Sequence, residues 1–184
     1  MLSETMRLDT LTFEKDIVTR DGLRLRLRPV EAGDAPALVD ICQASTPDDV
    51  RMRFLGTIRA APGSLFNKLS DYDHDRQIAM AAYDPAAPAR DRRFLAVVRL
   101  ILAPDDSHAE FAIMVRSDIK GHGLGHRLMR EMLDWAVARR LGWVEGHVMA
   151  ENRAMLRLAG DFGAVLDRPN NDFRTVRVKF DLRV

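Results

Sequence analysis

Three glycines at alternate positions, between a strand pattern and the longest helix pattern, constrain this 184-residue chain most. The segment reads Val115-Arg-Ser-Asp-Ile-Lys-Gly-His-Gly-Leu-Gly-His126. Glycine permits positive φ and lets the backbone approach a ligand closely. The unpaired N–H groups of a helix start carry partial positive charge and favour a diphosphate. The segment therefore predicts a strand, a phosphate-binding turn and a helix, although such glycines also serve a plain tight turn.

Two dinucleotide-binding motifs do not fit this segment. The Rossmann fingerprint requires G-x-G-x-x-G after the first strand, and here the spacing is G-x-G-x-G after the fourth strand pattern. The Walker loop requires G-x-x-x-x-G-K-[ST], which the chain lacks. The phosphate site, if it forms, belongs to another class.

The hydrophobic patterns along the chain predict one domain that mixes strands and helices. Strand patterns cover 23–28, 77–83, 94–102, 108–115, 144–149 and 175–182. Helix patterns follow Asp34, Ser45 and Ser64, and two more cover 123–141 and 152–162. We expect a single α/β (α+β) domain over 21–184, with a mixed central sheet of about six to seven strands flanked by helices. Residues 1–20 are expected to be a polar lead-in, partly helical at most.

The composition excludes several classes of partner. The chain has 28 Lys and Arg against 27 Asp and Glu, and this balance gives no global attraction to nucleic acid or to an acidic membrane. Its longest apolar run, 78–83, is too short to span a bilayer. The single cysteine, Cys42, cannot form an internal disulfide and fits a reducing compartment. We expect a cytoplasmic protein with no nucleic-acid or membrane partner, and the oligomeric state stays open.

Several of these residues resemble the GNAT superfamily of acyl-CoA-dependent N-acetyltransferases. Lys120-Gly-His-Gly123-Leu-Gly125 resembles its pyrophosphate loop, Q/R-x-x-G-x-G/A, with Lys in the first position. Asn152-Arg-Ala-Met-Leu-Arg-Leu158 resembles its second motif, in which Ala159 replaces the usual Tyr. The stretches at 25–30, 34–38, 45–54 and 110–115 look like the acetyltransferase domain of bacterial protein-lysine acetyltransferases.

The resemblance implies a site for acetyl-CoA as co-substrate and no metal. It implies a V-shaped gap between the fourth strand, 108–115, and the fifth strand, 144–149. It also implies a set of cofactor-binding residues: Ile113, Met114, Val115, Lys120, Gly121, His122, Gly123, Leu124, Gly125, His126 and Asn152. His122 and His126 have a spacing that metal ligands use, but no third ligand is evident in the sequence.

Attack on a thioester requires a neutral amine, which makes a general base the main catalytic need. A lysine with a pKa of about 10.4 is neutral in roughly 1 molecule in 2,500 at pH 7. By resemblance the base is Glu110, and the competing interpretation is a surface carboxylate paired with an arginine. His147 is a second candidate base. An amide N–H near Met114 is the expected donor to the oxyanion. With Ala159 at the Tyr position, a dedicated acid is not expected.

Three functions remain open at this stage. The favoured one is an N-acetyltransferase that modifies protein lysines. The second is an acetyltransferase whose acceptor is a small amine. The third is a non-catalytic module that senses acyl-CoA and regulates a partner.

Overall fold

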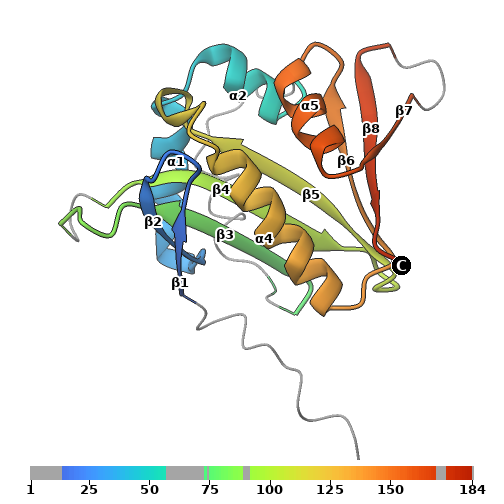
Figure 1. Ribbon diagram of the computed structural model, residues 1–184, viewed down its shortest axis with the longest axis horizontal. Coiled ribbons are helices and arrows are strands. Elements are labelled where there is room, and N and C mark those ends of the chain that lie inside the picture. The colour runs from blue at the N-terminus through green and yellow to red at the C-terminus, as the bar shows by residue number, and fades with distance from the viewer. Residues whose placement is uncertain (1–13, 57–72, 74, 89–91, 169–172, 184) are drawn as a thin grey trace, which may run out of the picture.

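The computed structural model describes residues 14–56, 73, 75–88, 92–168 and 173–183, and these build one mixed sheet with helices on both faces (Figure 1). The sheet has eight strands in the order β1-β2-β3-β4-β5-β6-β8-β7. The strands are β1 (Lys15–Val18), β2 (Arg24–Pro29), β3 (Gln77–Tyr83), β4 (Phe94–Leu102), β5 (His108–Val115), β6 (Trp143–Met149), β7 (Val165–Asp167) and β8 (Thr175–Asp181). All neighbouring strands pair antiparallel except β5 and β6, which are parallel.

The sheet separates the core into two layers, and each layer is covered by its own helices. The described helices are η1 (Ala32–Asp34), α1 (Ala35–Gln43), α2 (Pro47–Arg53), η3 (Ser117–Ile119), α4 (Leu124–Ala138) and α5 (Arg153–Asp161). Leu128 and Met132 of α4 are fully buried against one face of the sheet, together with Leu100 and Phe111. On the other face, the apolar side of α1 packs against Ala79, Ala81 and Met114. Figure 1 shows α4 crossing the near face of the sheet.

Strands β5 and β6 separate after a short paired stretch. Their pairing runs from His108 with Trp143 to Glu110 with Glu145 and then stops. At the next position Phe111 lies against the backbone of Gly146, where an added Cβ would be 2.7 Å from the nearest ring carbon. The Phe111 ring also packs edge-on against Phe180, with centroids 5.7 Å apart. The rest of β5 therefore has an open edge, and this is the V-shaped gap that the resemblance implies.

The sequence predicted the class and most of the elements correctly. The α/β class, the mixed sheet and the gap between the expected fourth and fifth strands are confirmed, but the sheet is larger than six to seven strands. Part of the expected lead-in over 1–20 is strand β1, which Lys15 attaches to the buried Glu131 of α4 through a 2.9 Å ion pair. Strand β7 was not predicted. The helix expected after Ser64 lies outside the described residues.

Substituting Gly146 by alanine is expected to lower the free energy of unfolding by about 1–3 kcal/mol, the usual cost of overpacking a core. The new Cβ would lie 2.7 Å from one ring carbon of Phe111 and 3.0 Å from its carbonyl oxygen, so β5 or β6 must shift. Urea unfolding followed by circular dichroism measures this loss. Gly160→Ala is the matched control: its added Cβ meets nothing within 4 Å on α5, and it should be neutral or stabilise by up to about 1 kcal/mol. Equal stability of the Gly146 variant and the wild type would refute the packing constraint.

Candidate functional site

A cavity of about 820 Å³ occupies the gap between β5 and β6. That volume is within the usual range for small-molecule sites, roughly 300–1,000 Å³. The start of α4 and one side of α5 form its walls, and α2 contributes from the opposite side of the sheet. Phe111 and Ile113 line the cavity from the α4 face of β5, whereas Ala112 and Met114 line it from the α2 face. The cavity therefore passes through the sheet.

The glycine-rich turn presents bare backbone at one end of the cavity. Gly121 and Gly123 have φ of 90° and 80°, values that side-chain-bearing residues rarely adopt. Gly123 is the N-cap of α4, and no side chain caps the helix there. The first N–H groups of α4 consequently have no side-chain acceptor, and the residues around them, from Gly121 to His126, line the cavity. This geometry suits a diphosphate, whose oxygens accept such bonds.

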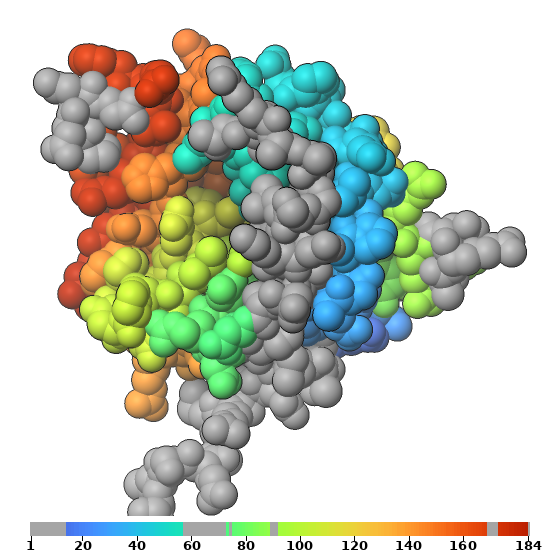
Figure 2. Space-filling view, turned by 180° about the vertical axis from the view of Figure 1, so that it is seen from behind, coloured from blue at the N-terminus to red at the C-terminus, as the bar shows by residue number. Residues whose placement is uncertain are grey.

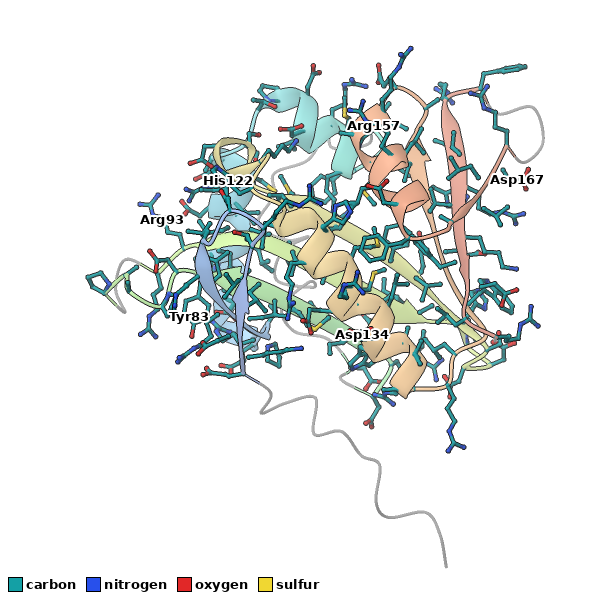
Figure 3. All side chains as sticks on the ribbon, viewed as in Figure 1. Tyr83, Arg93, His122, Asp134, Arg157 and Asp167 are labelled. Carbon is teal, nitrogen blue, oxygen red and sulfur yellow. The ribbon has the colours of Figure 1, made fainter. Side chains whose placement is uncertain are left out.

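Each basic side chain of the turn is paired with an aspartate from a different element. The pairs are Lys120 with Asp49 of α2, His122 with Asp21 of the β1–β2 turn, and His126 with Asp161 of α5, the last at 3.2 Å. In Figure 3 the labelled His122 lies beside the loop that joins β1 and β2. Because these side chains already have partners, the turn offers a ligand mainly its backbone N–H groups.

The pKa values of two of these aspartates reflect the pairing. Hydrogen bonds from Thr19 and then from His122 lower the pKa of Asp21 to about 2. Burial alone would raise the pKa of Asp49, but hydrogen bonds from Lys120 and Ser117 outweigh it and lower that pKa. Both carboxylates are therefore charged at neutral pH and hold the turn to the β1–β2 loop and to α2.

The backbone of β5 directs alternate amides into the gap. The N–H of Arg116 donates to the carbonyl of Leu95 on β4 at 2.9 Å, so the amides of Met114 and Ala112 also face β4. The amides of Ile113 and Val115 consequently face the open side. Among the three β5 residues expected at the cofactor, Met114 therefore contributes its side chain to the cavity wall and no free amide.

The two candidate bases occupy different places. Glu110 lies on the α2 face of β5, is exposed, and stands beside Glu145 of β6 at the closed end of the gap. It is absent from the cavity lining, whereas the exposed His147, two residues beyond Glu145 on the same face, belongs to that lining. The Oε2 of Glu145 accepts a 3.0 Å hydrogen bond from the Trp143 indole. Sequence reasoning placed Glu110 on the correct face but could not show how far along the gap it lies.

The start of α5 combines a structural and a ligand-facing residue. The Asn152 side chain caps the helix by accepting a 3.1 Å bond from the Met155 amide, and Asn152 also lines the cavity. The capping role of Asn152 is compatible with contact to a ligand. Ala159, at the position of the family's Tyr, is fully buried and faces the core.

Sequence reasoning missed several residues of the cavity wall. Arg20 comes from the turn after β1, and Arg53 is the last residue of α2. Arg157 of α5 lines the cavity as well, and Figure 3 labels it near α2. Arg53 and Arg157 lie in stretches that carried the family resemblance, but neither is a defining position of a motif. Each of the three reaches the cavity through tertiary packing.

Two features of the described residues concern a metal and a membrane as partners. Among the described residues, no three His, Cys, Asp or Glu side chains gather as a metal site. His122 and His126 bond to different aspartates. None of the helices in the described part of the chain combines the length and hydropathy needed to cross a membrane.

Comparisons with known proteins agree with this geometry. Residues 24–165 match the family model described as the acetyltransferase (GNAT) domain. A Pseudomonas aeruginosa protein named Acetyltransferase PA5475 is 29% identical over 154 residues, which cover 83% of this chain and 81% of that protein.

Solved structures show the same fold at lower identity. The GNAT domain of S. lividans PAT has a TM-score of 0.80 at 24% identity, covering 91% of this chain and 96% of that one. Spermidine N-acetyltransferase from Vibrio cholerae, solved with CoA and spermine, has a TM-score of 0.67 at 20% identity, covering 86% and 95%. With the family model matching most of its length, the chain belongs to the GNAT acetyltransferase family, the acetyl-CoA-dependent N-acetyltransferases.

Proposed function

We propose that this enzyme transfers an acetyl group from acetyl-CoA directly to a primary amine, with a protein lysine as the favoured acceptor. The observation that carries the proposal is the open edge of β5, which leads from the uncapped start of α4 to the face of the sheet on which Glu110 and His147 are exposed. Acetyl-CoA supplies the thioester, and the chain supplies positioning, oxyanion stabilisation and proton removal.

The residues present fit a CoA molecule along this edge. We infer that the amides of Gly121 to His126 bind the diphosphate, because α4 has no side-chain cap and the turn is open. The exposed amides and carbonyls of Ile113 and Val115 would pair with the pantetheine arm, with Met114 beside it and Asn152 facing it across the gap. Arg20 adds a positive charge at the diphosphate end.

In the reaction, the C–N bond forms as the C–S bond breaks, and the ammonium proton must leave first. We assign proton removal to Glu110, on the face from which an acceptor would enter, with His147 as the alternative. The amide of Ile113 or Val115 is the donor for the oxyanion, since the Met114 amide faces β4. The thiolate leaves without a dedicated acid, because a thiol pKa of about 8.5 is near working pH.

Direct transfer fits the state of the single cysteine. Cys42 is buried, and its sulfur lies 3.8 Å from that of Met114. Burial raises the pKa of the Cys42 thiol to about 11, so the group is a neutral thiol at working pH and a poor nucleophile. An acetyl-cysteine step is therefore not part of the proposal.

The shape of the acceptor side supports a protein substrate. In Figure 2, part of the shared face of β5, β6 and β8 is visible beside α2, which contacts β5 and β6. Glu110 and His147 are exposed on that face. A polyamine would require a closed acidic pocket, whereas a lysine on a protein surface requires an open approach such as this one.

Incubation of the purified protein with acetyl-CoA and a panel of lysine peptides and polyamines, read by mass spectrometry, tests the acceptor class. We expect acetylation of peptide lysines to exceed that of spermidine. Preferential acetylation of the polyamine would favour the small-amine alternative. Tight acetyl-CoA binding without transfer to any amine would favour a non-catalytic sensor.

The cofactor assignment predicts that Gly121→Glu loses CoA affinity far more than Gly121→Ala. Both side chains incur the same penalty at φ 90°, and neither meets an atom within 4 Å at Cβ. Only the glutamate places a negative charge beside the diphosphate. Isothermal titration calorimetry should show a loss of roughly tenfold or more between the two variants, the value of a like-charge contact of about 1.4 kcal/mol. Equal Kd values would remove the diphosphate from this turn.

The base assignment predicts that Glu110→Gln lowers kcat/KM for the amine by roughly 10²- to 10⁴-fold at pH 7, the usual range for general-base removal. CoA affinity should change little, because backbone groups hold the cofactor. The deficit should shrink as pH rises toward the acceptor pKa, where the amine no longer needs a base. Glu145→Gln, the neighbouring carboxylate, is the control and should not share this pH dependence. A deficit that stays flat from pH 6.5 to 10 would exclude Glu110 and direct the test to His147.

A further inference from the structure

Arg53 lies in the cavity wall, and the proposed reaction gives it no role. It ends α2 and lines the main cavity together with Ala112 and Met114. It also lines a small apolar recess next to that cavity, beside Cys42 and Leu38. The Arg53 guanidinium therefore lies where the α2 face of the sheet meets the gap.

No carboxylate of the described chain forms an ion pair with Arg53. Its guanidinium carbon lies 4.9 Å from the centroid of the Phe54 ring. By contrast Arg51, on the same helix, pairs with Glu151 and with Asp48. Burial, with a smaller contribution from the charge of Arg99, lowers the pKa of Arg53 to about 10, although Cys42 and Glu110 act in the opposite direction. Arg53 is half-buried, and a cation in such a place that has no counter-ion among the described residues can be paired by a ligand.

In the placement proposed above, the diphosphate and the thioester of acetyl-CoA bring no negative charge to Arg53. The diphosphate belongs at the start of α4, on the backbone of the glycine-rich turn. The thioester end, which would lie beside Ala112 and Met114, is uncharged. Of the two substrates of the proposed reaction, the acceptor is therefore the one that can bring an anion to Arg53.

We propose that Arg53 binds a carboxylate of the acceptor, so that the enzyme selects amines that carry an acidic group close to the reacting nitrogen. This inference rests on the proposed acetyltransferase function and specifies its substrate class. Two sources share this chemistry: a free amino acid, and a lysine flanked by Asp or Glu in a protein. A bidentate guanidinium–carboxylate contact also fixes the orientation of the amine.

The charges on the acceptor face complement such a molecule. Glu110 and Glu145 lie side by side in the parallel register of β5 and β6 and offer two negative charges to an ammonium. Arg53 offers a positive charge within electrostatic range of Glu110. An acceptor with both an ammonium and a carboxylate complements the two glutamates and the arginine, whereas a polyamine would bring further positive charge toward Arg53.

The test compares acceptors that differ only in this charge. One pair is an amino acid and its carboxamide; the other is a lysine peptide with flanking Glu and the same peptide with flanking Gln. We expect the wild-type protein to show a KM about 10- to 100-fold lower for the acidic member of at least one pair, the range of a charge-assisted hydrogen bond. The pair that shows the preference identifies the source of the carboxylate.

Variants then assign the preference to Arg53. Arg53→Met retains an unbranched stem against Phe54 and should abolish the acidic preference, while Arg53→Glu should reverse it. Arg93→Met, a change at an exposed arginine paired with Asp40, should retain the wild-type preference. CoA affinity, measured separately, shows that each variant is folded. If a variant does not fold, the wild-type ratio for each pair still decides the proposal.

Failure of the Arg53 inference and failure of the proposed acetyltransferase function give different results. Equal use of acidic and neutral acceptors by the wild-type protein would overturn the role of Arg53 and leave the acetyltransferase function intact. An equal fall in kcat for both acceptors in Arg53→Met would also overturn it, because the charge would then act on the reacting carbonyl. Absence of transfer to every acceptor would overturn the proposed function together with this inference.

Discussion

The contact between Phe111 and Gly146 is the constraint on which the site depends. Parallel strands in the middle of a sheet normally pair along their whole length, and here pairing stops after Glu110 and Glu145. Phe111 lies so close to the β6 backbone that only glycine leaves room for it. Beyond this point the amides of β5 face an empty edge, and such groups require a partner. An extended ligand with its own amides satisfies them, so the strands' separation both opens the cavity and determines what binds there.

Side-chain bonds to three aspartates hold the glycine-rich turn in place and leave its backbone N–H groups available to a ligand. Each of its three basic side chains is bonded to an aspartate of another element, which fixes the turn to α2, to the β1–β2 loop and to α5. A turn with free lysine and histidine side chains would attract many anions. Pairing removes that general attraction, and the remaining donors, the N–H groups at the start of α4, have a geometry that selects phosphate.

The elements that were predicted correctly from sequence are those whose patterns are local. The alternation over 108–115 and 175–182 and the apolar stripe of α4 each report which face is buried, so they mark strand and helix without tertiary information. Strands β1 and β7 have four and three residues, too few to show a period. β1 is held in part by the ion pair from Lys15 to Glu131, 116 positions away. The placement of Arg53 and the distance of Glu110 from the cavity arise in the same way, from packing between distant segments.

The alternation of β5 assigns its two faces to two different tasks. Phe111, Ile113 and Val115 direct their side chains to the α4 core and their amides to the gap, so core packing determines which amides a ligand in the gap would meet. Glu110, Ala112 and Met114 direct their side chains to the α2 face and their amides to β4, so changes among these side chains leave the amides of the gap in place. The proposed acceptor therefore meets side chains whose charge can change by substitution, and Arg53 lines the cavity on the same face. Specificity for the amine can therefore change on this face without loss of the proposed cofactor site, because the side chains of one face and the gap-facing amides belong to different residues of the strand.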